Sequence, residues 1–505
     1  MSFELGDKGH GSMRWLWLYL FAGTVVRLAY GLVIQPWHQQ PDQIAWGMVL
    51  SSVRWSDGIS YWQLIHYPHE GGTILLSLLG LMTGSIGKLP ALSVAALLFD
   101  LFSRGIQLLV VRRFFSRPVL HWFGAWTVLS MPGVLPWAVV NYGLHSLAAF
   151  VPFALLWLSF RESTGGRGHL LDGLVLGAMI WFSYSTIALV PLYVFFRRDM
   201  FGFPKHWLSF FGAFAVLLGS HVLVRSAFDP GFHLSGFSPA TIRGMALDAP
   251  FAKLFDQVDH LWTSSFPGSS MLPPILGLPA ALVRRFWALI MLAGFVGASI
   301  AWYRRRTDER HLRFCMLAVL LFGLVYAASP FFHESPDRTA FVHYRHWPFI
   351  LPMAALMAIA GLRTFRYALA PLLGHALLCM AGVAMMFTAG KSNERKFKET
   401  GYVLSIKFGH DPRRLSDIAC RRPDAEADLF RGAGWGTAEV LLAFHGPAQR
   451  DLDTLAALTS RYAQRERPWF REGLALALSR DAMRHLSPDM REQVRGLIPT
   501  PDSER

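Results

Sequence analysis

The chain has 505 residues, of which 53% are hydrophobic and only 16% are charged, and its mean hydropathy is +0.32. This composition is typical of a multi-spanning membrane protein. The formal net charge of +14 would suit a nucleic-acid-binding protein. However, the arginines lie in short clusters between apolar runs, where they orient a membrane chain by the positive-inside bias, so we expect no nucleic-acid partner. The three cysteines are scattered, which excludes a disulfide framework and a cysteine metal motif.

The first membrane helix is predicted over residues 15–34. Residues 1–13 are polar and Gly-rich, and we expect them to be disordered. The apolar run that follows Arg14 is long enough to cross a bilayer and has no small-residue cleavage site, so it is a retained helix and not a removable signal. It delivers residues 36–72 to the outer face. The next run, 73–86, is short and interrupted by glycines, so we expect it to lie in the interface or to re-enter.

The remaining apolar runs extend the membrane domain to residue 390. They predict membrane helices over residues 89–111, 119–137, 144–160, 207–224, 286–303, 314–328, 349–362 and 367–389. The run 170–196 is longer than one span and contains Gly173, Gly177 and Pro191, so we expect two short helices in a bent hairpin with both ends inside. With this topology nearly every arginine pair falls on one side. The sequence therefore predicts that residues 14–390 form a multi-pass domain, which we expect in a bacterial inner (plasma) membrane.

From residue 391 onward the apolar runs disappear and the charge rises. Residues 391–505 predict a small soluble helical domain, which the topology places outside the cytoplasm. Pro468 suits a first helical turn, and Ser487 followed by Pro488 suits a helix N-cap. The Gly-rich sequence RGAGWG around Trp435 follows no strand and lacks the GxGxxG spacing, so a phosphate-binding loop is the less favoured interpretation.

Polar residues collect in three outer loops. Because buried charges near a bilayer are costly unless paired or solvated, this concentration predicts a cavity at the outer membrane boundary. The loops are residues 36–72, the NYGLHS turn and the sequence HESPDRTAFVHYRHWP. The candidate residues that they carry are Asp42, His66, Tyr67, His69, Glu70, Asn141, His145, Arg338, His343, Tyr344 and Arg345.

These features resemble the GT-C superfamily of integral-membrane glycosyltransferases, which includes bacterial enzymes similar to dolichyl-phosphate-mannose mannosyltransferases. The resemblance rests on Asp42 soon after the first helix, on HYPHEGGTILLSLLG leading into the membrane, and on HYRHWPFILP in a late outer loop. It covers roughly residues 14–390. It implies an all-α GT-C-like helical bundle with outer-face loops and interfacial helices. It also implies sugar transfer from a polyprenyl-phosphate donor on the outer face.

The resemblance also implies roles for individual residues. Asp42 takes the place of the acid that acts as catalytic base or metal ligand, and Arg345, with Tyr344 nearby, that of the group contacting the lipid phosphate. The chemistry of the residues agrees, because sugar transfer needs a base for the acceptor and a cation for the departing phosphate. The planar guanidinium of Arg345 suits a phosphate, and Arg338 or His343 would assist it. Glu70 and His69 suit sugar hydroxyls or a second acid/base pair, with Tyr67 among the aromatic residues available for stacking.

Two positions depart from the family pattern. Asp42 is followed by Gln43 where two adjacent acids are common, and His145 stands where a second acid is expected. These departures leave open a metal-independent or a non-catalytic member. A divalent-cation site built from Asp42, His66, His69 and Glu70 has no recognised spacing and stays an alternative.

Structural interpretations compete with each assignment. Asp42 suits the cap of an interfacial helix that begins after Pro41. Glu70 has His66 and His69 as possible partners, and Arg345 has Glu334 and Asp337. His145 and the aromatic residues suit hydrogen-bonded or aromatic-belt positions. The leading prediction is a glycosyltransferase whose partners are a polyprenyl-phosphate-linked sugar, membrane lipid and a glycan, lipid or protein acceptor. The alternative is a transporter or lipid-binding membrane protein whose polar outer cavity carries no reaction.

Overall fold

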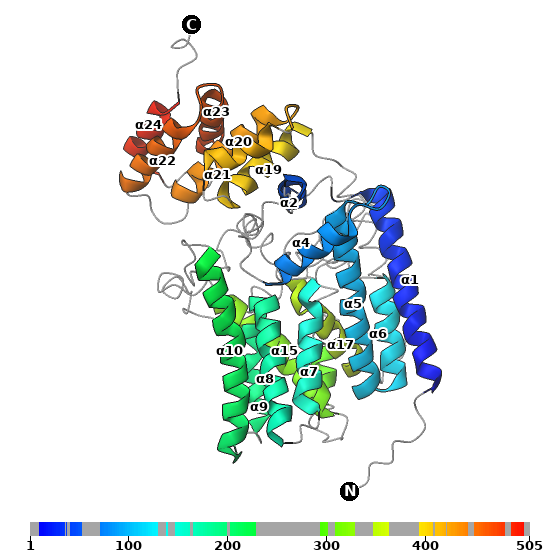
Figure 1. The fold of residues 1–505 in the computed structure, drawn as a ribbon. Helices are drawn as coiled ribbons and strands as arrows, with labels where there is room; N and C mark the ends of the chain where they lie inside the picture. Colours follow the sequence, from blue (N-terminus) through cyan, green and yellow to red (C-terminus); the bar gives the residue numbers. More distant parts are fainter. Residues whose placement is uncertain are drawn as a thin grey trace. The chain divides into compact units, whose positions relative to one another are not determined.

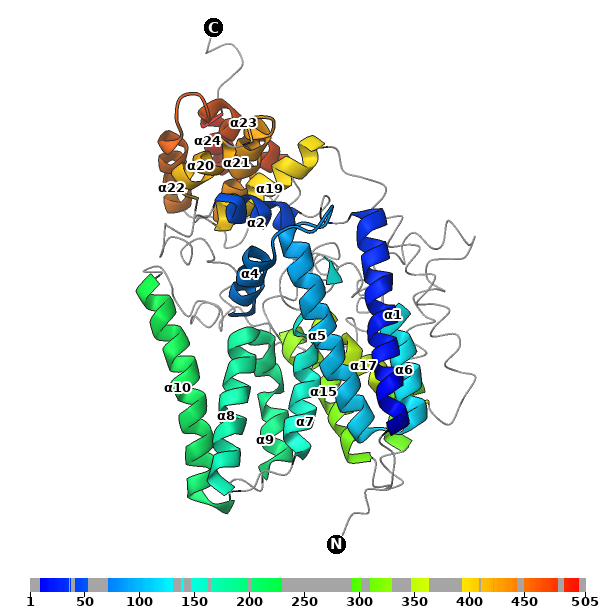
Figure 2. The ribbon, with the colours of Figure 1, turned by 45° about the vertical axis from the view of Figure 1, so that its right-hand side comes forward.

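The protein is described here from a computed structural model (Figures 1 and 2). It describes residues 10–35, 37, 41–52, 71–129, 138–139, 147–161, 165–198, 202–228, 293–300, 309–328, 347–362, 393–407, 410–420, 422–442, 449–479 and 486–498. Within these ranges the regular structure is helical, and the only β pairing is an isolated bridge between Ile86 and Leu89. The expected all-α class is thus confirmed for the described residues.

The chain divides into two compact units. The first contains Met1–Pro36 and Pro68–Ala389, and the second contains Trp37–Tyr67 together with Gly390–Arg505. The sequence predicted one boundary, near residue 390. The structure adds a second division, because the segment after the first helix groups with the C-terminal residues instead of with the membrane domain.

Three helices among the described residues are long and apolar enough to cross a membrane by length and composition. They are Met13–Val33 within α1 (His10–Ile34), Ala91–Phe114, which is α5, and Arg310–Ala328 within α15 (Glu309–Ala328). All three lie where the sequence predicted spans. Helix α1 begins at His10, inside the segment expected to be disordered, so only residues 1–9 of that prediction lie outside the described residues.

The first unit contains further helices. They are α4 (Gly71–Thr83), α6 (Arg117–Leu129), α7 (Val151–Phe160), α8 (Gly165–Phe182), α9 (Val190–Phe196), α10 (Pro204–Phe228) and α17 (Leu351–Gly361), with 3-10 turns at Leu147–Phe150, Tyr184–Leu189 and Trp347–Phe349. The core lies where α5, α6, α7, α15 and α17 meet. Its fully buried side chains include Val111, Phe123, Phe153, Phe314 and Leu356. Apolar residues on α1 such as Phe21 and Val33 are instead exposed, as expected for a helix surface that meets hydrocarbon.

The bent hairpin predicted over residues 170–196 is present. Helix α8 ends at Phe182, and a 3-10 turn then leads into α9, whose first turn contains Pro191. Asp172 near the start of α8 pairs with Arg197 just after α9, with 3.7 Å between the carboxylate and guanidinium atoms. The two ends of the hairpin therefore lie together, as the sequence predicted.

The second unit is a row of short helices. They are α2 (Pro41–Ser52), α19 (Asn393–Lys407), α20 (Pro412–Ala419), α21 (Glu426–Leu442), α22 (Gln449–Arg461), α23 (Arg467–Leu478) and α24 (Pro488–Gly496). Helix α21 packs between α19 and α23. Two sequence predictions are confirmed here: Pro468 lies in the first turn of α23, and the Ser487 hydroxyl accepts a hydrogen bond from the Met490 amide as an N-cap.

The RGAGWG sequence lies inside α21, which rules out a phosphate-binding loop at this position. Its glycines allow close helix packing. A Cβ atom on Gly432 would overlap the Lys398 carbonyl oxygen of α19, and one on Gly434 would overlap the Phe470 carbonyl oxygen of α23. Because no side chain fits at these contacts, glycine lets three helices approach backbone to backbone.

Candidate functional site

Of the residues predicted for the site, only Asp42 lies on a described element. It is the second residue of α2, so the helix expected after Pro41 exists. The structure does not describe the Asp42 side chain. The other predicted site residues lie outside the described residues: His66, Tyr67, His69, Glu70, Asn141, His145, Arg338, His343, Tyr344 and Arg345. Their proximity to one another therefore stays a prediction.

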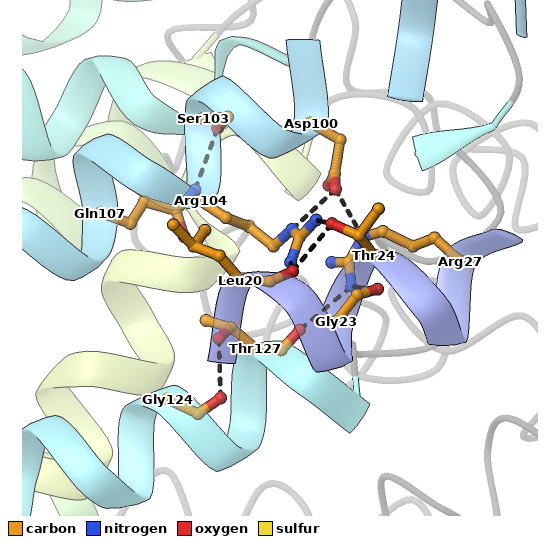
Figure 3. A network of polar contacts seen from close by, with 10 residues as sticks. All are labelled: Leu20, Gly23, Thr24, Arg27, Asp100, Ser103, Arg104, Gln107, Gly124 and Thr127. Atoms are coloured by element: carbon orange, nitrogen blue, oxygen red, sulfur yellow. Dashed lines mark hydrogen bonds and ion pairs between the residues drawn. The ribbon is translucent and has the colours of Figure 1, made fainter. Parts of the chain in front are cut away.

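The described polar residues form a different constellation, inside the helical bundle of the first unit (Figure 3). Arg27 of α1 and Arg104 of α5 both contact the carboxylate of Asp100, which also belongs to α5. The Nε atoms of the two arginines lie 2.5 Å and 2.7 Å from the same oxygen, Asp100 Oδ2. Arg27 is 1% exposed, Arg104 2% and Asp100 5%. We call these three residues the α1–α5 ion cluster.

Three further guanidinium nitrogens of the cluster donate to backbone carbonyl or hydroxyl oxygens. Arg27 Nη1 donates to the carbonyl oxygens of Gly23 at 3.0 Å and of Thr127 in α6 at 3.2 Å. Arg104 Nη1 donates to the Leu20 carbonyl at 3.2 Å, and its Nη2 donates to the Thr24 hydroxyl at 2.9 Å. The ion cluster thus joins three helices, α1, α5 and α6.

Local sequence explains how the ion cluster forms. Asp100 and Arg104 are four residues apart on α5, so they share one helix face. Gly23 gives the Arg104 side chain room against α1, because a Cβ atom there would lie 2.3 Å from Arg104 Nη1. Glycine at position 23 therefore leaves room for the Arg104 guanidinium in the position that it occupies in the cluster.

The charges of the ion cluster do not cancel. Two guanidinium groups face one carboxylate, and arginine stays protonated in proteins. A buried charge costs several kcal/mol unless it is paired, and an ionisable group within a membrane-spanning segment is by default a candidate for function. The carbonyl oxygens of Leu20, Gly23 and Thr127 offset part of the excess positive charge.

A second buried carboxylate repeats the pattern where α7, α8 and α9 meet. Asp172 of α8 is fully buried and lies 2.5 Å from Arg161 Nη2 and 3.7 Å from Arg197 Nη2. Arg197 also donates to the Arg161 carbonyl at 2.7 Å, and Arg161 donates to the Gly168 carbonyl at 3.1 Å. Since Arg161 and Arg197 follow the ends of α7 and α9, this cluster fastens helix ends.

Both clusters were missed at the sequence level, because Arg27, Asp100, Arg104 and Asp172 lie within apolar runs and Arg161 and Arg197 directly follow such runs. One signal was available: Asp100 and Arg104 form an i,i+4 acid–base pair within a run otherwise suited to a membrane span, and Arg27 interrupts the first span. Nothing in the sequence indicates that these residues meet.

The described residues contain no group of three metal-ligating side chains. Every candidate in the proposed cation set except Asp42 falls outside them. Divalent-cation binding therefore stays a prediction.

Comparison with known proteins adds no assignment. No family model, no curated protein and no solved structure matches this chain.

Proposed function

We propose that the protein is a multi-pass membrane glycosyltransferase that transfers a sugar from a polyprenyl-phosphate donor to an acceptor on the outer face. The observation that carries this proposal is the position of Asp42. A helix of membrane-spanning length ends at Ile34, and Asp42 follows in the first turn of a separate helix, α2. This order of elements is what the resemblance to GT-C enzymes implies for their catalytic acid.

In the proposed reaction, different residues act on the acceptor and on the departing phosphate. Asp42 takes the proton from the acceptor hydroxyl or amide as the new bond to the anomeric carbon forms. The bond from that carbon to the phosphate oxygen breaks, and the electron pair leaves with the polyprenyl phosphate. Arg345 stabilises the departing phosphate through paired hydrogen bonds, while Glu70 and His69 hold sugar hydroxyls.

The test is transfer of labelled sugar from a polyprenyl-phosphate donor by the purified protein. Loss of a general base lowers turnover by about 10²–10⁴-fold, so we expect a loss of this size for Asp42→Asn. The matched control is Asp417→Asn, because Asp417 is an exposed carboxylate on α20. Equal turnover by wild type and Asp42→Asn would contradict the base role.

The alternative, a transporter or lipid-binding protein without a reaction, is favoured by the α1–α5 ion cluster. Charged residues inside a membrane bundle commonly mark an ion or substrate pathway. This function predicts saturable lipid or solute binding by wild type and Asp42→Asn alike, with no product of sugar transfer. Binding of the donor without turnover, and its loss in Arg104→Gln, would support it over the glycosyltransferase.

A further inference from the structure

Helix α2 belongs to the C-terminal unit although it is encoded directly after the first membrane helix. It packs against α19 and α20, and the unit combines Trp37–Tyr67 with Gly390–Arg505. Figures 1 and 2 show α2 beside α19, at the end of the unit away from α22 and α24. A segment of the first outer loop is therefore part of a domain that lies mostly beyond residue 390.

The side chains of α2 explain why it needs a packing partner. Ala45 is 0% exposed and Val49 2%, and these residues lie one helical turn apart on a shared face. Gln43, Trp46, Met48 and Leu50 are buried as well, so α2 is covered over most of its circumference. Gly47 is exposed, and a Cβ atom there would meet nothing within 4 Å. A helix of 12 residues is marginal in isolation, so tertiary packing maintains α2.

The order of helices in the unit indicates what α2 covers. Helices α19, α21 and α23 lie side by side, with α21 in the middle. In such a row each helix buries its faces against its neighbours, and a terminal helix leaves one face that needs a cap. Helix α23 packs with α24 at one end, and α19 packs with α2 at the other.

We propose that α2 is the capping helix of the C-terminal domain, and that this domain acts as the positioning element for Asp42. The second part rests on the glycosyltransferase function proposed above. Asp42 lies in the first turn of α2, so its backbone position is set when α2 is helical and packed. Folding of residues 393–498 therefore determines where the candidate base is held, which gives the C-terminal domain a role in the reaction.

Hydrogen exchange on the full-length protein tests the capping role in both directions. Val49→Asp places an unpaired charge at a buried position of α2, and we expect amides of α19 to exchange about tenfold faster or more. Gly47→Asp adds the same charge to the exposed side of the same helix and is the matched control. Val49→Ala provides a milder variant if Val49→Asp does not accumulate.

A second experiment asks whether a substitution distant from α2 in the row of helices affects hydrogen exchange in α2. Gly434→Ala disturbs the contact between α21 and α23, and we expect it to speed exchange in α2 as well as in α23. Gly496→Ala, at a glycine with open space around it, is the control. Unchanged exchange in α19 for both Val49 variants, or in α2 for Gly434→Ala, would overturn the capping role.

The transfer assay tests the positioning role. In Val49→Ala we expect a lower kcat with an unchanged KM for the polyprenyl-phosphate donor, because the base moves while the phosphate contacts stay. A wild-type kcat in a Val49→Ala protein with faster α2 exchange would overturn this role. Absence of transfer by the wild type would contradict the proposed function and the positioning role together, whereas exchange alone decides the capping role.

Discussion

Arg27 and Arg104 share a single carboxylate oxygen of Asp100, although Arg27 lies on α1 and the other two residues lie on α5. All three are buried in the helical bundle of the first unit. The carboxylate therefore holds two like charges together, and its removal should lower the free energy of unfolding.

Asp100→Ala leaves two buried guanidinium groups without their shared acceptor. We expect a loss of about 3–5 kcal/mol in the free energy of unfolding, because breaking a buried pair strands an uncompensated charge. Thermal denaturation in detergent would show this as a lower melting temperature or as loss of folded protein. Asp417→Asn, at an exposed carboxylate, should change stability little.

A triple variant separates the cost of a broken pair from the value of the intact one. Arg27→Met, Asp100→Leu and Arg104→Leu together replace the ion cluster with apolar groups. Since buried ion pairs are often replaced by apolar residues without loss, we expect much of the stability lost in Asp100→Ala to return. Greater instability of the triple variant than of Asp100→Ala would show that the cluster contributes favourably through its hydrogen bonds to Leu20, Gly23 and Thr127.

Gly432→Ala tests backbone contact in the C-terminal domain. The new Cβ atom would overlap the Lys398 carbonyl oxygen, so α19 and α21 must separate, and such overpacking typically costs about 1–3 kcal/mol. Hydrogen exchange of α19 and α21 amides measures the effect. At the open position 496 the same substitution should leave exchange in these helices unchanged. Equal exchange in both variants would mean that glycine is not required at this crossing.

The surroundings of His410 predict that the stability of the C-terminal domain depends on pH. Its Nδ1 lies 3.1 Å from the Ser405 hydroxyl and 3.0 Å from the Thr437 hydroxyl, and burial lowers the pKa of its imidazole. In the unfolded chain the pKa returns to about 6.5, so the unfolded state binds the proton more readily. The free energy of unfolding is therefore unaffected by protonation of His410 above about pH 6.5. It decreases as the pH falls toward the lower pKa of His410 in the folded state.

His410→Asn removes the titration and keeps a hydrogen-bonding group. Asn also tolerates the positive φ of 61° at this position. We expect the domain of the wild type to lose protection between pH 7 and pH 5 in hydrogen exchange, and the variant to lose less. An equal pH slope in both proteins would assign the pH dependence to another group.

Individual residues show how far sequence patterns reach. The spans in α1, α5 and α15 were predictable because about 20 consecutive apolar residues have few alternatives to crossing a bilayer. The N-cap at Ser487 and the break between α8 and α9 follow from short-range backbone chemistry at Pro488 and Pro191. The same local rules could not show whether RGAGWG is a loop or a helix. Its glycines are required by close contacts with the backbones of α19 and α23, which are distant in sequence.

The all-α class, the helices long enough to cross a membrane and the helical C-terminal region could be inferred from the sequence, because each depends on residues near one another along the chain. Tertiary structure alone decided two other features. It brought Arg27 to Asp100 and Arg104, and it assigned α2 to the C-terminal domain. Both features depend on contacts between residues far apart in sequence. Neither a hydrophobic period nor a motif specifies which helix packs against the buried face of another helix.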